Sequence, residues 1–292
     1  MKPVLLAVSL LAFSAPALAQ SSVNERHTLA SGGRVELDNL AGEIRVRAAT
    51  GNEVTLTGTL GEGQRLEVDK SADRLELRVV YPQRSGHSEG ARLELRVPRG
   101  ALLETESVSG RVDIAEIDLA RLQAQTVSGS LSVSGRAQEA QLSTVSGSLE
   151  TRLATQRLRA NTVSGRLSVG EGAAGDLGLE SISGGLSLKA GALSRLHAET
   201  VSGSQDIAVG ALAAGGTIGL ETVSGSISLR LPVDVSARLR VETFSGDIES
   251  DAGQVQRPEY GPGRSLEARL GGGNGDVTVD SHSGSVRVRR GG

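Results

Sequence analysis

The chain has 292 residues, 1% aromatic residues, no cysteine and a formal net charge of −3. The negative charge argues against a nucleic-acid partner. Without cysteine no disulfide can staple the fold, so stability must come from a packed core, and the chain is long enough to bury one.

Residues 1–19 have the three parts of a secretory signal peptide. Lys2 is the charged start, residues 4–13 are the apolar run, and Ala17-Leu18-Ala19 is the cleavage site, which leaves Gln20 as the first mature residue. The apolar run is too short to span a membrane, and no cysteine follows it to carry a lipid anchor. We therefore expect an exported protein, periplasmic, secreted or on the cell surface, with no transmembrane segment in the mature chain.

Residues 20–100 are predicted to form an N-terminal coil with capping hairpins. Apolar residues alternate on both sides of Gly42, and further alternating runs follow at residues 75–79 and 93–97, separated by turn signals. The end of a stacked β-structure exposes unpaired strand edges, so we expect these hairpins to cover them.

Residues 101–292 repeat one unit of the form Thr-Val-Ser-Gly-x-Leu-x-Val, as in residues 126–133. Successive repeats lie 18 to 22 residues apart, except for the 38 residues between the last two, where a Pro- and Gly-rich excursion at residues 254–275 interrupts the series. The repeat glycines are Gly110, Gly129, Gly147, Gly165, Gly184, Gly203, Gly225, Gly246 and Gly284. Copies of one unit at such a period stack on one another.

Each repeat contains two runs of alternating apolar and polar residues, a pattern typical of β-strands with one buried face. The apolar residues before the Ser-Gly pair, Leu122 and Ala124, have even numbers, whereas those around and after it, Val127, Leu131 and Val133, have odd numbers. If the apolar side chains of both runs point into the core, the strand must therefore change face at the Ser-Gly pair. Glycine tolerates the backbone angles or the close approach of such a corner. We predict an all-β fold, a single-stranded β-helix or β-solenoid of about ten coils, with two strands per coil and a looser return.

Several columns beside the corner are expected to line up through the stack. The threonine column, which includes Thr126 and Thr162, is expected to satisfy backbone groups at the corner; the alternative is a flat hydroxyl surface that binds a lattice or a glycan. Phe244 and His282 replace the repeat valine, so we expect Phe244 in the core and His282 packed at the end of the rod. A recurring acidic column is the candidate interaction stripe, with a plain solvated face as the alternative: Glu180, Glu199, Glu221 and Glu242.

The ordered set of these columns resembles a known family. The residues that carry the resemblance are Val35-x-Leu37, Gly42-x-Ile44-x-Val46, Leu95-Arg96-Val97-Pro98 and the Thr-Val-Ser-Gly-x-Leu-x-Val units. They resemble the bacterial putative-adhesin family of β-strand-repeat domains of unknown function over nearly the whole mature chain. The resemblance implies a single-stranded β-helix that is exported or envelope-associated, and it implies no catalytic residues.

No catalytic, cofactor or metal site emerges from the sequence. The histidines His27, His87, His197 and His282 share no metal-binding spacing. Residues 271–276 faintly resemble a calcium-binding nonapeptide that normally recurs many times, but they occur once.

We therefore expect a non-enzymatic exported β-solenoid that presents a repetitive surface to a protein or glycan, as an adhesin-like module or an accessory in envelope stress signalling. The first alternative is a polysaccharide-active β-helix enzyme, which would need clustered carboxylates and aromatic platforms. The second is a purely structural periplasmic spacer.

Overall fold

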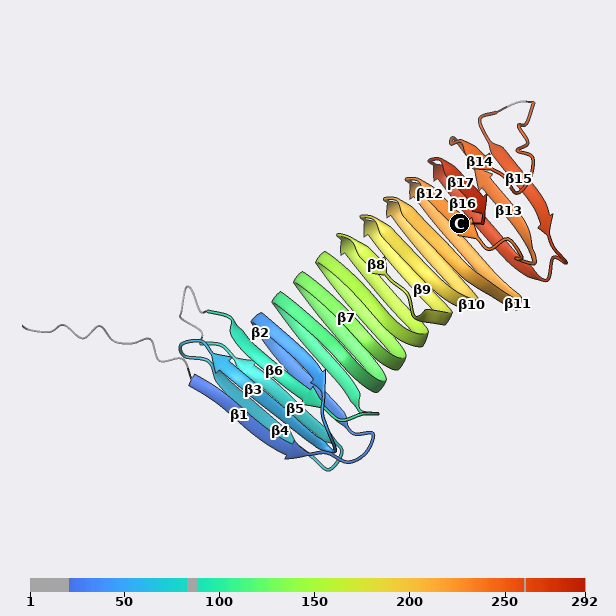
Figure 1. Ribbon diagram of the computed structural model, residues 1–292. Helices are drawn as coiled ribbons and strands as arrows, with labels where there is room; N and C mark the ends of the chain where they lie inside the picture. The colour runs from blue at the N-terminus through green and yellow to red at the C-terminus, as the bar shows by residue number, and fades with distance from the viewer. Residues whose placement is uncertain (1–20, 83–88, 260, 292) are drawn as a thin grey trace, which may run out of the picture.

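The computed structural model describes residues 21–82, 89–259 and 261–291, and it confirms the all-β solenoid. Figure 1 shows coils stacked into a rod, with separate groups of strands at the two ends. Within the described ranges there is no helix long and apolar enough to cross a membrane. The predicted signal peptide at residues 1–19, together with His87 and Tyr260, lies outside the described residues.

The strands in chain order are β1 (Ser21–Thr28), β2 (Arg34–Ala48), β3 (Glu53–Leu60), β4 (Arg65–Lys70), β5 (Arg74–Val80), β6 (Ala91–Val97), β7 (Leu102–Ser164), β8 (Leu167–Val169), β9 (Ala173–Ser183), β10 (Leu186–Ser202), β11 (Gln205–Ser224), β12 (Ile227–Leu231), β13 (Ala237–Thr243), β14 (Ile248–Ser250), β15 (Arg264–Leu270), β16 (Gly275–Ser283) and β17 (Val286–Arg290).

Parallel pairing between successive coils builds the central array. β7 winds through several coils without a break, pairing with β2 on one side and with β8 and β9 on the other, and β10 and β11 continue the stack. The alternating residues of both runs, such as Leu122 and Leu131, are buried in one continuous core. The expected looser return is found in some coils only. Within β7 the return stays in the parallel ladder, whereas the chain leaves the strands at residues 170–172 and 232–236, and the register shifts between Thr155 and Arg157 and between Leu193 and Arg195.

The coils do not stack in chain order at the C-terminal end. The last repeat, β16 and β17, lies between the β11–β12 coil and the β13–β14 coil (Figure 1). β15, which belongs to the excursion at residues 254–275, pairs antiparallel with β13 and occupies its outer edge. Because β15 occupies the outer edge of β13, the next strand, β16, pairs with the inner edge of β13. The excursion provides the chain length that β16 needs to reach this position.

Antiparallel strands cover the N-terminal end. β5 and β6 pair in parallel with β2 and so form one more layer of the stack. β4 then pairs with β5, β3 with β6 and β1 with β3, all antiparallel. Tyr81 closes the corner of this layer, since its hydroxyl accepts from the Ala41 amide at 3.0 Å and lies 2.8 Å from Asn39 Oδ1.

Candidate interaction surface

The corner glycines form a column in which consecutive backbones touch. A Cβ built on Gly129 would lie 1.8 Å from the carbonyl oxygen of Gly110, and one on Gly147 would lie 1.8 Å from that of Gly129. Gly129 also has a φ of 140°, which side chains with a Cβ rarely adopt. In stack order the column is Gly42, Gly110, Gly129, Gly147, Gly165, Gly184, Gly203, Gly225, Gly284 and Gly246.

The threonine column lies inside the coil, so it cannot form a hydroxyl surface for a lattice or a glycan. Thr126 is 3% exposed. The expected hydrogen bonds to the corner are missing at four members of the column: the hydroxyls of Thr126, Thr144, Thr162 and Ser181 have no hydrogen-bond partner among the described residues. Thr243 and Ser281 do fit the expectation: the Thr243 hydroxyl accepts from the Gly246 amide at 3.0 Å, and the Ser281 hydroxyl donates to the Gly284 carbonyl oxygen at 3.5 Å.

The residue after each threonine points outward, and these residues form an exposed apolar stripe along the rod. Adjacent strand residues face opposite sides, so a buried Thr126 forces Val127 into solvent. The placement of Val127 and Phe244 in the core is therefore wrong: they are 47% and 57% exposed. In stack order the apolar stripe comprises Leu40, Val108, Val127, Val145, Val163, Ile182, Val201, Val223, His282 and Phe244.

His282 lies within the stack rather than at its end. Its ring stacks on that of Phe244, with ring centroids 5.1 Å apart and an interplanar angle of 3°. These two side chains continue the apolar stripe across the last coils, because β16 lies between β11 and β13. The stripe thus changes from aliphatic to aromatic at the C-terminal end.

An exposed serine column borders one side of the apolar stripe, and a polar column two residues before the stripe borders the other. The structure brings together the predicted Glu180, Glu199, Glu221 and Glu242, and it inserts Asp280 between Glu221 and Glu242 through the register of β16. These five residues are here called the acidic ladder. Sequence reasoning missed Asp280, an aspartate in a column of glutamates whose repeat follows that of Glu242 only after the excursion, although Asp280 precedes Ser281 just as the glutamates precede Ser181 and their threonines.

Repulsion within the acidic ladder is only partly compensated. Glu242 pairs with Arg240 at 2.6 Å, and Glu199 lies 3.9 Å from His197. Among the described residues, no basic side chain lies within 4.0 Å of the carboxylates of Glu180, Glu221 or Asp280. Burial, followed by the charges of Glu242 and Glu221, raises the pKa of Asp280, against the opposing effect of Arg240.

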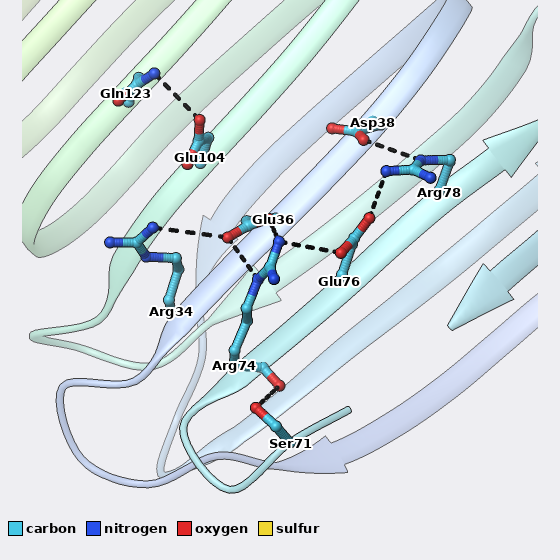
Figure 2. Close-up of polar contacts among 9 residues, drawn as sticks. All are labelled: Arg34, Glu36, Asp38, Ser71, Arg74, Glu76, Arg78, Glu104 and Gln123. Carbon is cyan, nitrogen blue, oxygen red and sulfur yellow. Dashed lines mark hydrogen bonds and ion pairs between the residues drawn. The ribbon is translucent and has the colours of Figure 1, made fainter. Parts of the chain in front are cut away.

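At the N-terminal end, arginines pair with acidic residues of neighbouring strands (Figure 2). Arg74 bridges Glu36 at 2.5 Å and Glu76 at 3.1 Å, and Arg78 binds Glu76 at 2.5 Å and Asp38 at 3.2 Å. Hydrogen bonds and charges from Glu36 and Asp38 raise the pKa values of Arg74 and Arg78, respectively. Asp38 and Glu106 hold the position that the acidic ladder holds farther along the stack. Asp38 pairs with Arg78, whereas burial, followed by the charge of Asp38, raises the pKa of Glu106.

Two grooves flank the apolar stripe. The C-terminal groove has a volume of about 710 Å³ and lies between the end of the stripe and a wall formed by residues 256–258 and 263–265. Its other side carries Glu199, Glu221, Glu242 and Asp280, with Val223, Phe244 and His282. A smaller groove of about 360 Å³ follows Leu40, Val108, Val127 and Val145 at the N-terminal end.

Side chains that could hold a metal ion do not come together in the described part of the chain. Among the described residues, no three His, Asp or Glu side chains are grouped so as to hold a metal ion. His27, His197 and His282 lie on three different strands, β1, β10 and β16.

Comparison with known proteins places the chain in a family. The family model described as Toastrack DUF4097 matches residues 33–289. A comparison with curated proteins found no match. Among solved structures, the chain is similar to a putative adhesin from Parabacteroides merdae ATCC 43184, with 10% identity, a TM-score of 0.42, and coverage of 93% of this chain and 96% of that one.

A putative adhesin from Parabacteroides distasonis ATCC 8503 is similar at 12% identity with a TM-score of 0.41, covering 93% of this chain and 97% of that one. A protein from the same strain described as a putative lipid binding protein is similar at 11% identity with a TM-score of 0.35, again covering 93% and 97%. The family model spans most of the chain, from the first coil to the last strand, and the protein therefore belongs to the Toastrack DUF4097 family.

Proposed function

We propose that this protein is an exported, non-enzymatic interaction module that binds a protein partner along the apolar stripe. The observation that carries the proposal is the exposure of aliphatic side chains at one column in coil after coil: Val108, Val127, Val145, Val163 and Val201 are 43–47% exposed. Contiguous exposed apolar surface of this kind marks interaction sites in soluble proteins.

The stripe also separates this proposal from its alternatives. A structural spacer does not require an exposed apolar side chain at each repeat, since threonine is polar and favours strands as valine does. A glycan surface typically uses aromatic platforms, and the stripe offers only Phe244 and His282. A polysaccharide-active enzyme would need a pair of carboxylates on the two sides of the scissile bond, whereas the carboxylates that the acidic ladder contributes to the C-terminal groove all lie along one border of it.

Export follows from the signal-peptide pattern at residues 1–19 and agrees with an adhesin-like or envelope-associated role. Ten rungs at roughly 4.8 Å give a stripe on the order of 45 Å long, enough for an extended contact with a partner.

Site-specific photo-crosslinking in the native cells tests this proposal. A photoreactive phenylalanine analogue at Val127, Val163 or Val201 should give the same protein adduct, while the analogue at the exposed control positions Arg136 and Glu150 should give none. Adducts that form equally at the control positions, or at none of the stripe positions, would overturn the proposal.

A further inference from the structure

The C-terminal groove combines apolar surface, negative charge and concave shape. Its apolar part is the end of the stripe, where Val223 is 50% and Phe244 is 57% exposed. Along one border of this apolar surface run four consecutive carboxylates of the acidic ladder, in the stack order Glu199, Glu221, Asp280 and Glu242.

The charge of the groove is not balanced from within. The opposite wall contributes Arg257 and Arg264, but Arg264 already pairs with Asp247 outside the ladder. Glu221 and Asp280 lie opposite each other in adjacent parallel strands, a placement that is destabilising for like charges. A cationic ligand would relieve this repulsion, and the raised pKa of Asp280 is in keeping with an uncompensated site.

The repeat distance indicates the shape of the ligand. Consecutive rungs are about 4.8 Å apart, whereas an α-helix lying along the rod advances about 5.4 Å per turn. One side chain from each turn of the helix can therefore contact one rung of the rod, and this match holds over three or four successive rungs. An extended strand places same-face side chains about 6.8 Å apart and loses this match after one rung.

Resting on the proposed function, we propose that the C-terminal groove binds an amphipathic α-helix of a partner protein. The apolar side chains of the helix lie on Val223, His282 and Phe244, which line the groove. A neighbouring row of arginines or lysines lies over the acidic ladder, where guanidinium groups form charge-assisted hydrogen bonds with the carboxylates. A cation at the end of this row can also lie over the exposed Phe244 ring.

The test is fluorescence anisotropy with the mature chain and three labelled peptides of about 18 residues, roughly 27 Å as a helix. The first peptide carries leucines and arginines on adjacent faces of one helix. The second has the same composition in an order that destroys the two faces, and the third replaces arginine by glutamate. We expect the first peptide to bind at least tenfold more tightly than the other two.

Two triple variants then locate the site. Glu221→Gln with Asp280→Asn and Glu242→Gln should weaken binding of the first peptide at least tenfold. The matched control, Glu94→Gln with Glu139→Gln and Glu150→Gln, changes the net charge equally at exposed ion pairs elsewhere and should leave the dissociation constant within twofold. Circular dichroism melts confirm that both triple variants are folded.

Each outcome decides the inference. Equal binding of the first two peptides would show plain charge attraction and overturn the helical fit, and equal weakening by both triple variants would overturn the location. No binding of any peptide, together with crosslinks at Val127 and Val163, would overturn this inference while leaving the proposed function standing. Failure of the crosslinks as well would remove both.

Discussion

Substituting one corner glycine by alanine is predicted to be among the most destabilising changes in the chain. In Gly184→Ala the new Cβ would lie 1.8 Å from the carbonyl oxygen of Gly165, where ordinary contacts begin at 3.4 Å, so the two coils must separate by about 1.6 Å. Such a shift breaks one or two hydrogen bonds between rungs, at about 1–3 kcal/mol for each buried group left unpaired. The φ of 151° adds about 1 kcal/mol of strain.

The expected loss is therefore about 3–5 kcal/mol in the free energy of unfolding, which corresponds to a fall in melting temperature of roughly 10 °C for a chain of this size. The neighbouring Gly185→Ala is the matched control, because its Cβ would meet only Ser204 Oγ at 3.6 Å. Circular dichroism melts of the two variants, measured together with the unmodified mature chain, give the comparison.

Two further variants separate the causes. Gly203→Ala tests the clash alone: its Cβ would lie 1.9 Å from the Gly184 carbonyl oxygen, and the backbone at Gly203 is not left-handed. Gly51→Ala tests the backbone strain alone: Gly51 has a φ of 120°, and the space around its Cβ is open. If contact between coils dominates, Gly203→Ala will melt close to Gly184→Ala, and Gly51→Ala will melt close to Gly185→Ala. A Gly184→Ala chain that melts within about 2 °C of Gly185→Ala would refute the steric argument.

Three other predictions concern buried or repelling polar groups, each measured as a melting temperature. Thr162→Val should raise stability by about 1 kcal/mol, because it removes a buried hydroxyl without a partner; a decrease would show that this hydroxyl is satisfied. Tyr81→Phe should lower stability by about 1–3 kcal/mol, because it leaves the Ala41 amide unpaired; no change would mean that water replaces the phenol. Burial and the charge of Glu242 raise the pKa of Asp280, so protonation of Asp280 favours the folded chain. The stabilisation by this proton is complete below the ordinary pKa of 3.8, and it is lost as the pH rises through the raised pKa of the folded chain. Asp280→Asn should therefore raise the melting temperature at pH 7 and leave it nearly unchanged at pH 3, and an equal effect at both pH values would contradict the assignment.

The coil architecture is predictable from local pattern. Alternation in runs such as residues 131–133 specifies strands with one buried face, and repetition of the unit specifies stacking, since one repeat cannot bury its apolar face alone. The repeated Ser-Gly pair marks the position of the corner, and the structure shows the reason in the close backbone contact at Gly129 and its equivalents.

The direction of each side chain at the corner is less accessible to sequence reasoning. Continuing the alternation of Leu122 and Ala124 places Thr126 in the core and Val127 in solvent, but the apolar character of valine suggested that Val127 lies in the core. The structure resolves the conflict through strand geometry, which admits only one inward residue of an adjacent pair. The apolar stripe, and with it the candidate site, follows from that choice.

The sequence by itself determined the strand type, the period, the corner glycines and four of the five acids of the acidic ladder, because these depend on residues close together in the chain. The tertiary structure alone decided that the last coil enters between β11 and β13, which joins Asp280 to Glu221 and Glu242 and stacks His282 on Phe244. The physical reason is that pairing between coils depends on which strand edge is free, and β15 had already covered the outer edge of β13.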